Sequence, residues 1–165
     1  MRELTTPWRL RYILSNKDQS GCIFCRKPAD RSKSSLILHR GTGCYVIMNL
    51  YPYTAGHLMV VPYRHIARHA ALTLGERSEM ALLLRRAERA LRDELGATEV
   101  AMGINLERIA GAGVVGHLHA HLVPLAVATP AVDAGGHDPG WEEPALPEPV
   151  GDTFKRLRAS FARPA

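Results

Sequence analysis

Residues 117–123, His-Leu-His-Ala-His-Leu-Val, constrain the fold most, because apolar residues and histidines alternate strictly along them. Side chains of a β-strand point to opposite faces in turn, and residues i and i+2 stand about 7 Å apart. The three histidines therefore share one face of the predicted strand, while Leu118, Ala120 and Leu122 share the other. Such a strand predicts a sheet with one packed face and one face that carries imidazoles.

Other segments predict the rest of this sheet. They are rich in β-branched and large apolar residues, and they span residues 35–39, 44–50, 57–61 and 99–105. Residues 40–43, Arg-Gly-Thr-Gly, separate the first two segments and indicate a hairpin, and Pro62 ends the third.

Between Thr73 and Gly96 the apolar residues recur at helical spacing. Thr73 and Glu76 fit a capping box at the start of this predicted helix, and Gly96 fits its C-terminal stop. Strands on both sides of one long helix, with an early hairpin, favour an α+β fold on an antiparallel sheet.

The length of 165 residues suits a single domain. We expect a main unit over residues 1–128, a loop rich in proline and glycine over 129–151, and a short C-terminal helix of the same domain over 152–165. Asp152 is predicted to cap that helix. Its apolar face comprises Phe154, Leu157 and Phe161.

Charge and hydropathy narrow the range of partners. Lys and Arg number 21 against 16 Asp and Glu, so the net charge of +5 modestly favours anionic partners such as phosphates. The basic residues are scattered among acidic ones, which argues against nucleic acid. No apolar run approaches the roughly 20 residues of a membrane span, and residues 1–4 lack the layout of a secretory signal. We expect a cytoplasmic protein that binds no membrane.

Residues 111–116 satisfy Gly-x-Gly-x-x-Gly, the dinucleotide-binding fingerprint. That fingerprint functions where its last glycine opens a helix in a βαβ unit, whereas a strand pattern and Pro124 follow here. We therefore reject the dinucleotide interpretation and predict no redox cofactor. The glycines, Gly113 among them, let the backbone approach a bound anion closely.

The row of histidines has two functional interpretations. Histidines at i and i+2 on a strand can supply two ligands to one metal ion. Alternatively, a central histidine is a nucleophile towards phosphorus, and its neighbours hold its tautomer and bind the phosphate. We favour the nucleophile, because the strand carries no carboxylate at ligand spacing and a glycine loop directly precedes it.

Cys22-Ile-Phe-Cys25 indicates a metal site, a redox pair or core thiols. The chain has three cysteines, and an odd number argues against a disulfide framework. A redox pair would open a helix after a strand, a setting that this region does not show. A zinc site needs four nitrogen or sulfur ligands, so two more must come from elsewhere in the chain.

Three motifs together resemble the histidine triad (HIT) superfamily, and within it the branch of diadenosine polyphosphate phosphorylases and hydrolases. They are the His-x-His-x-His of residues 117–121, Asn49 followed by Gly-His-Leu-Met-Val-Val-Pro at 56–62, and the lead-in Thr-Pro-Trp-Arg-Leu-Arg-Tyr-Ile at 6–13. The resemblance covers residues 4–124. It implies a HIT-like fold on a five-stranded antiparallel sheet, usually in a homodimer. It also implies attack on the α-phosphate of a nucleotide or dinucleoside polyphosphate, through a covalent nucleotidyl-histidine.

The resemblance also implies roles for particular residues. His119 matches the nucleophile, and His121 and His57 match histidines that bind phosphate oxygens. Asn49 matches a residue that bonds ribose hydroxyls, and Leu50 lies with the residues around the base. Asn105 matches an asparagine near the leaving group.

A structural zinc follows from the same resemblance. In many similar HIT proteins the Cys-x-x-Cys pairs with a histidine after the strand-ending proline and with the first histidine of the triad. These ligands would be Cys22, Cys25, His65 and His117, so His117 would orient the site rather than react. Cys44 is expected in the core.

After the triad the chain departs from the phosphorylase-like branch. That branch continues with an Arg-Trp pair, whereas residues 123–129 read Val-Pro-Leu-Ala-Val-Ala-Thr. Contacts to the distal nucleotide or the acceptor are therefore expected to differ. Two rival functions are a nucleotide-binding regulatory protein without turnover and a metal-dependent hydrolase that uses the histidines as ligands.

Overall fold

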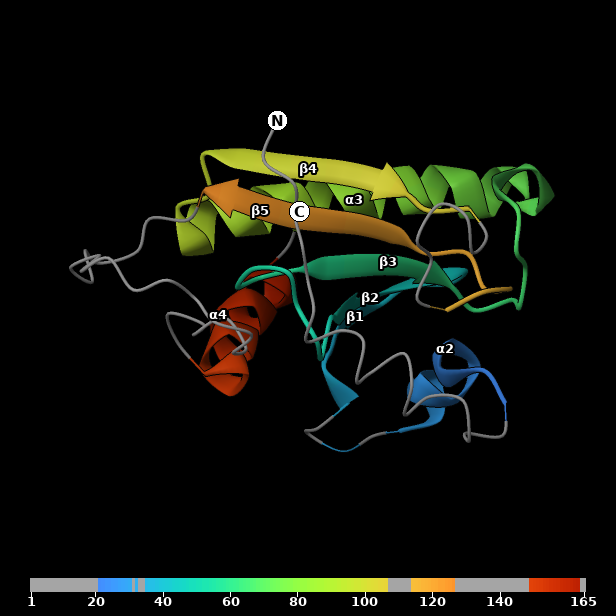
Figure 1. Ribbon diagram of the computed structural model, residues 1–165, viewed down its shortest axis with the longest axis horizontal. Helices are drawn as coiled ribbons and strands as arrows, with labels where there is room; N and C mark the ends of the chain where they lie inside the picture. Colours follow the sequence, from blue (N-terminus) through green and yellow to red (C-terminus); the bar gives the residue numbers. More distant parts are fainter. Residues whose placement is uncertain (1–20, 31, 33–34, 107–113, 127–148, 164–165) are drawn as a thin grey trace, which may run out of the picture.

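The structure, a computed structural model, describes residues 21–30, 32, 35–106, 114–126 and 149–163 (Figure 1). Within these ranges, five strands form one antiparallel sheet in the order β1-β2-β3-β5-β4. The strands are β1 (Ile37–Arg40), β2 (Cys44–Met48), β3 (Leu58–Pro62), β4 (Glu99–Ile104) and β5 (Ala120–Ala126). The α+β fold on a five-stranded antiparallel sheet is confirmed.

The long helix is α3, which spans Leu74–Leu95. Thr73 and Glu76 form the predicted capping box, and Gly96 ends the helix with a φ of 64°, the left-handed conformation that glycine adopts without a Cβ penalty. Two short helical segments precede β1, a third lies between β3 and α3, and a second longer helix follows β5. They are α2 (Ile23–Arg26), η2 (Lys27–Ala29), η4 (His69–Ala71) and α4 (Val150–Ala162).

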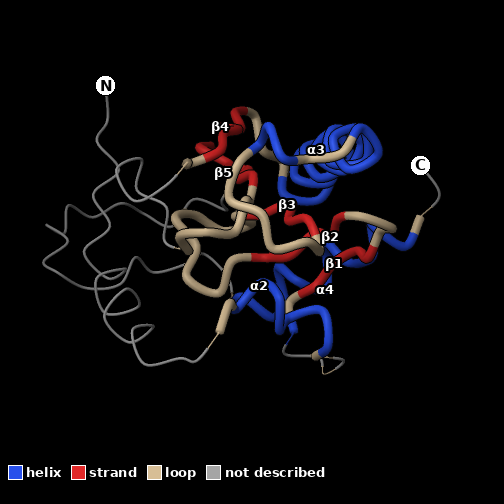
Figure 2. The backbone as a smooth tube through the Cα atoms, turned by 90° about the vertical axis from the view of Figure 1, so that its right-hand side faces the viewer, coloured by secondary structure: helices blue, strands red, loops and turns tan. Residues whose placement is uncertain are grey.

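Two apolar clusters lie on opposite faces of the sheet. On one face α3 and α4 pack against the strands, and Leu118, Ala120 and Leu122 belong to this larger cluster. On the other face α2 brings Phe24 against a smaller cluster that includes Tyr45 and Met59. Figure 2 shows α3 and α2 separated by the strands. The predicted alternation is therefore confirmed, because the apolar residues of the histidine segment face the larger core.

Glu79, a residue of α3, holds the turn between β1 and β2. The Glu79 carboxylate accepts hydrogen bonds from the backbone N–H groups of Thr42, Gly43 and Cys44, at 2.7, 2.6 and 2.8 Å. Charge-assisted bonds of this kind are stronger than neutral ones. The hairpin predicted from the glycines thus depends on a carboxylate distant in sequence. Cys44 is fully buried, as expected.

The strand that carries the histidines begins later than predicted. β5 starts at Ala120 rather than at His117, because the last β3 pair is Val60 with Ala120. The preceding extended segment bonds elsewhere, since the Leu118 N–H donates to the Ile66 carbonyl at 2.6 Å. His117 and His119 therefore lie directly before β5, outside the sheet ladder. β5 also runs through Pro124, where the register with β4 shifts.

Two further boundaries differ from the sequence predictions. β3 includes Pro62, which pairs with Cys44 at the end of the ladder. α4 begins at Val150 with Pro149 as its N-cap, so Asp152 is not the cap. The Asp152 N–H donates to the Pro149 carbonyl, and the Asp152 carboxylate pairs with Lys155 in the first turn. The expected apolar face is present, because Phe154, Leu157 and Phe161 are buried in the larger core.

Residues 127–148, which include most of the expected proline-rich loop, lie outside the described ranges. Among the helices that the structure describes, none combines the length and the hydropathy that a membrane crossing requires.

Candidate active site and metal cluster

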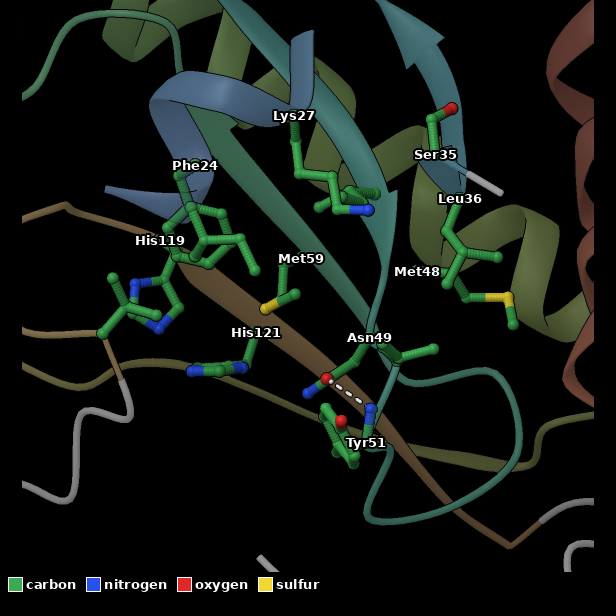
Figure 3. Close-up of a pocket in the computed structure, with 14 residues that line it drawn as sticks. Phe24, Lys27, Ser35, Leu36, Met48, Asn49, Tyr51, Met59, His119 and His121 are labelled. Carbon is green, nitrogen blue, oxygen red and sulfur yellow. Dashed lines mark hydrogen bonds between the residues drawn. The ribbon is translucent and has the colours of Figure 1, made fainter. Parts of the chain in front are cut away.

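A pocket that encloses about 600 Å³, open solvent included, lies between α2, the β1–β2 side of the sheet and the histidine segment (Figure 3). The walls are mainly apolar and include Ile23, Phe24, Leu36, Ile47, Met48 and Met59. Asn49, His119 and His121 are among the polar side chains that line the pocket, and Lys27 and Ser35 lie on the side away from His121 (Figure 3). The arrangement suits a ligand with one flat apolar part and one polar or charged part.

His119 is held in one tautomer by the backbone. Its Nδ1 lies 2.8 Å from the carbonyl oxygen of His117, and a carbonyl can only accept, so Nδ1–H donates. The lone pair of the neutral ring is then on Nε2. The ring is 3% exposed and lines the pocket, with the ring of Phe24 centred 4.9 Å away. A buried neutral imidazole oriented in this way has the properties of a nucleophile.

His57 and His121 form a hydrogen-bonded pair beside His119. The Tyr53 N–H donates to His57 Nδ1 at 3.3 Å, which places the ring proton of neutral His57 on Nε2. His57 Nε2 lies 2.9 Å from His121 Nδ1 and donates to it, so His121 carries its own proton on Nε2. His57 is fully buried and Tyr53 stacks on it at 5.0 Å. His121 is thereby prepared to donate a hydrogen bond at its second nitrogen.

The structure brings Asn49 into the same cluster. Asn49 is 8% exposed and lines the pocket; its Oδ1 accepts from the Tyr51 N–H at 3.0 Å, and its Nδ2 lies 3.2 Å from His57 Nδ1. Leu50 also lines the pocket and is half exposed.

Two predicted residues are not brought to the described pocket. Asn105 lies directly after the end of β4 and is absent from the pocket lining. Gly113 lies outside the described residues.

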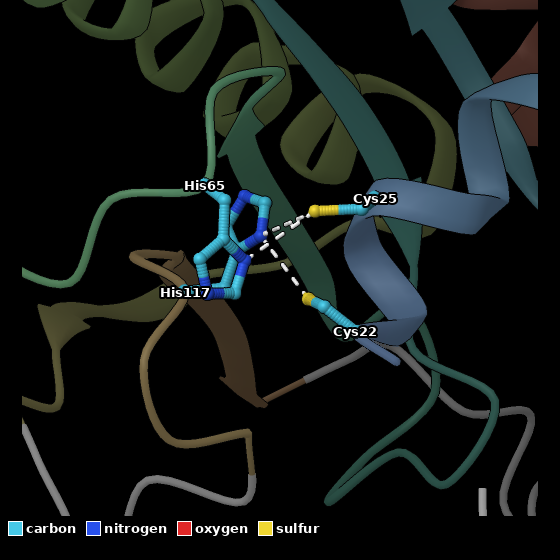
Figure 4. A group of neighbouring side chains, drawn as sticks. All are labelled: Cys22, Cys25, His65 and His117. Atoms are coloured by element: carbon cyan, nitrogen blue, oxygen red, sulfur yellow. Dashed lines mark hydrogen bonds between the residues drawn. The ribbon is translucent and has the colours of Figure 1, made fainter. Parts of the chain in front are cut away.

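A second cluster adjoins this pocket. Four ligand atoms, one each from Cys22, Cys25, His65 and His117, lie within 4.8 Å of one another (Figure 4). His117 Nδ1 is 3.2 Å from the Cys22 sulfur and 3.5 Å from the Cys25 sulfur, and His65 Nδ1 is 3.4 Å from the Cys25 sulfur. Zinc bonds of about 2.3 Å to sulfur and 2.0 Å to nitrogen at tetrahedral angles separate such ligands by about 3.5 Å. The four side chains therefore fit a tetrahedral metal ion.

The surroundings of His117 also fit a ligand role. Its Nε2 donates to the Pro62 carbonyl at 2.9 Å, so Nδ1 holds the lone pair and faces the sulfurs. Metal-binding histidines characteristically donate their other ring nitrogen in this way. Burial holds the pKa of His117 below its ordinary value, which favours the neutral form that binds metal.

The sequence interpretation missed several residues of the pocket. Phe24, between the two cysteines, contacts the rings of both His117 and His119. Lys27 lines the pocket from η2, and Ser35 lines it from the segment before β1. No local pattern signals these contacts, since they depend on how α2 folds back over the sheet.

Comparisons with known proteins agree with this geometry. The HIT domain family model matches residues 31–127. A relative described as AP-4-A phosphorylase, from Mycobacterium tuberculosis strain H37Rv, is 33% identical over 132 residues, which cover 75% of this chain and 68% of the relative. A second relative from the same strain, an uncharacterized HIT-like protein, is 30% identical over 103 residues, which cover 62% of this chain and 70% of that protein.

Solved structures share the fold. A zinc-bound histidine triad family protein from Mycobacterium smegmatis has a TM-score of 0.62 and 25% identity, covering 86% of this chain and 94% of that one. A hypothetical histidine triad nucleotide-binding protein from Sulfolobus tokodaii has a TM-score of 0.65 at 21% identity, covering 86% and 92% of the two chains. The chain belongs to the HIT domain family, and the resemblance found in its motifs is confirmed.

Proposed function

We propose that this protein is an enzyme that cleaves or transfers at the α-phosphate of a nucleotide, through a nucleotidyl-histidine formed on His119. HIT-family membership and the phosphorylase relative support an enzyme of nucleotide phosphoanhydrides. The observation that carries the proposal is the bond from His119 Nδ1 to the His117 carbonyl at 2.8 Å, which directs the lone pair of a buried imidazole to Nε2 in a pocket with mainly apolar walls. A dinucleoside polyphosphate is the substrate class that we favour.

The pocket suggests how a nucleotide binds. The base lies between the apolar walls, where Ile23, Leu36 and Leu50 offer apolar contacts. The Asn49 amide, at the boundary between the apolar and polar ends, bonds the ribose hydroxyls. The Nε2–H of His121 donates to an oxygen of the α-phosphate. His57 keeps that proton on Nε2, because it donates a hydrogen bond to Nδ1 of the same ring.

The reaction then has two displacements. Nε2 of His119 attacks the α-phosphorus; a P–N bond forms, and the P–O bond to the departing polyphosphate breaks with its electron pair. Inorganic phosphate or water next attacks the same phosphorus, the P–N bond breaks, and neutral His119 is regenerated once the acceptor has lost its proton. A covalent intermediate of this kind divides one difficult substitution into two easier ones.

We propose zinc as the occupant of the cluster formed by Cys22, Cys25, His65 and His117. Closed sites of two cysteines and two histidines are typical of structural zinc, which supplies folding free energy rather than chemistry. The ion would join the α2 segment to the loop after β3 and to the start of the histidine segment. A cytoplasmic location suits these ligands, because thiols stay reduced there.

We also propose a homodimer. β4 is an edge strand; Val100 and Ile104 pack against the larger core, whereas Met102 is 50% exposed and Leu106, just beyond the strand, is 44% exposed. An exposed apolar edge favours association with another chain. A second copy of the same surface provides a partner of matching character.

The geometry disfavours the metal-dependent hydrolase. Among the described residues, the cluster with metal-ligand spacing includes neither His119 nor His121. Each of these rings uses Nδ1 for a different bond, His119 to a carbonyl and His121 to His57.

The test is product analysis with diadenosine tetraphosphate, with and without inorganic phosphate. Phosphorolysis yields ADP and ATP only when phosphate is present, and hydrolysis yields AMP and ATP. Either result, together with a radiolabelled adduct that is acid-labile and absent from His119→Ala, supports the proposal. AMP binding without turnover of this or other nucleotide substrates would instead establish the regulatory binding protein.

A further inference from the structure

One short segment belongs to both sites. Residues 22–27, here called the metal arm, contribute Cys22 and Cys25 to the metal cluster. The residues between and after them, Ile23, Phe24 and Lys27, line the nucleotide pocket. Part of the pocket wall and half of the metal ligands therefore come from the same six residues of chain.

Phe24 makes the closest connection between the two sites. Its side chain is 4% exposed, and its ring is centred 5.5 Å from the ligand His117 and 4.9 Å from the proposed nucleophile His119. Its carbonyl oxygen accepts from the Tyr45 hydroxyl at 2.8 Å. Figure 3 shows the ring above His119 at the α2 side of the pocket. Any shift of the arm would move this ring relative to both histidines.

A second connection runs through His117 itself. Its ring Nδ1 faces the cysteine sulfurs, and its backbone carbonyl accepts the Nδ1 proton of His119. The residue that would hold the metal is thus also the residue that sets the tautomer of the nucleophile.

The arm has little stability of its own. α2 is four residues long, and a single helical turn is not stable in isolation. Arg40 anchors the chain directly after the arm by donating to the carbonyls of Pro28 and Asp30. At the near end, Cys22 and Cys25 contact His117 and His65, so a metal ion there would fix the arm against the sheet.

From these connections we propose that metal and nucleotide bind cooperatively, and that Phe24 is the positioning residue that couples them. This inference rests on the proposed function, because it takes the pocket as the nucleotide site. A metal ion at the cluster orders the arm, and the ordered arm completes the wall that a base contacts. Since coupling between two sites is reciprocal, a nucleotide in the pocket must strengthen metal binding by the same factor.

The experiment measures zinc affinity by competition with a chelator, with and without saturating AMP, on the full chain. A reference titration without protein corrects for binding of AMP to zinc. We expect AMP to raise the zinc affinity about tenfold, within the usual range of roughly 5–150-fold for coupled sites. Titration of AMP onto zinc-loaded and zinc-free protein should give the same ratio.

Three variants separate coupling from simple loss of structure. Phe24→Ala keeps all four ligands, so it should still bind one zinc ion, but the AMP-dependent ratio should fall to about one. Phe24→Leu retains an apolar side chain and should restore part of the ratio. Leu50→Ala is the matched control, because Leu50 lines the pocket outside the metal arm. It should weaken AMP binding and leave the ratio unchanged.

The outcomes are distinct. AMP binding to wild type with equal zinc affinity in its presence and absence would overturn the coupling and leave the proposed function standing. Failure of AMP to bind the zinc-loaded protein would overturn both. If Phe24→Ala fails to fold, the wild-type ratio and that of Phe24→Leu still decide the question.

Discussion

The backbone carbonyl of His117 lies 2.8 Å from Nδ1 of His119, while the His117 ring faces the sulfur of Cys22 at 3.2 Å. One residue thus orients a neighbour through its main chain and contributes to a metal cluster through its side chain. His117 therefore contacts the pocket residue His119 through its backbone carbonyl and the cysteines through its ring.

Replacing His119 by Ala should abolish turnover of diadenosine tetraphosphate, because no other described ring offers its nitrogen at this place in the pocket. Binding of AMP should stay within about tenfold, since catalysis and ground-state binding are separable. Turnover is followed by product chromatography and binding by calorimetry. The control is His69→Ala, an exposed histidine on η4, which should behave as wild type. Full activity of His119→Ala would refute the nucleotidyl-histidine.

Replacing Cys22 or Cys25 by Ser should remove the bound metal and lower the melting temperature. A structural zinc ion contributes folding free energy directly, so its loss should cost several degrees. Metal content is measured by mass spectrometry on untagged protein. Cys44→Ala is the thiol control, because Cys44 is buried under α3 and away from the cluster. It should retain one metal ion per chain, and a wild type without metal would contradict the assignment.

Stability should decrease in acid through Glu76. The Arg64 guanidinium and the Thr73 backbone lower the pKa of Glu76 to about 2. A carboxyl whose pKa is lower in the folded state stabilises the fold above its unfolded pKa, about 4.3, and this contribution disappears as pH falls towards 2. Glu76→Gln should therefore destabilise the protein at pH 7 by about 1–2 kcal/mol, and less at pH 2.5.

Urea denaturation at the two pH values measures this difference. Glu88→Gln serves as the control, because Glu88 pairs with Arg92 on the exposed face of α3. Such surface pairs contribute about 0.3–0.5 kcal/mol. An equal effect of Glu76→Gln at both pH values would show that the ion pair with Arg64 is not the cause.

Replacing Met102 by Glu should weaken the proposed dimer. The charge would fall on an exposed apolar edge strand, where desolvating a carboxylate opposes association. Light scattering across a dilution series measures the mass. Leu82→Glu introduces the same charge at a 60% exposed position of α3 and should leave the mass unchanged. A monomeric wild type at high concentration would remove the basis of the proposal.

Much of the fold follows from local sequence patterns. The caps of α3 are short-range features, and Thr73, Glu76 and Gly96 determine its ends within the chain itself. The strict alternation at 117–123 correctly predicts which side chains face the core. These predictions succeed because burial of one face enforces the period of the element.

Features that depend on distant partners could not be read in this way. The start of β5 is set by the bond from Leu118 to Ile66, which belongs to a loop with no strand pattern. Likewise, α2 folds over the sheet and brings Phe24 and Lys27 to the pocket, although neither has a local signature of ligand binding. Asp152 is of a residue type that commonly caps helices, but the N-cap of α4 is Pro149.

The hairpin held by Glu79 links two positions of the chain during evolution. A Cβ at Gly41 would collide with the Glu79 carboxylate, which already serves three backbone donors of the same turn, and with the backbone carbonyl of Cys44. Moving the acid alone would therefore not make room for a side chain at 41, while a descendant sequence that loses the acid must find new acceptors for the turn. Glycine should persist at 41 in every descendant that keeps the acid at 79, and an alignment of descendants would reveal this.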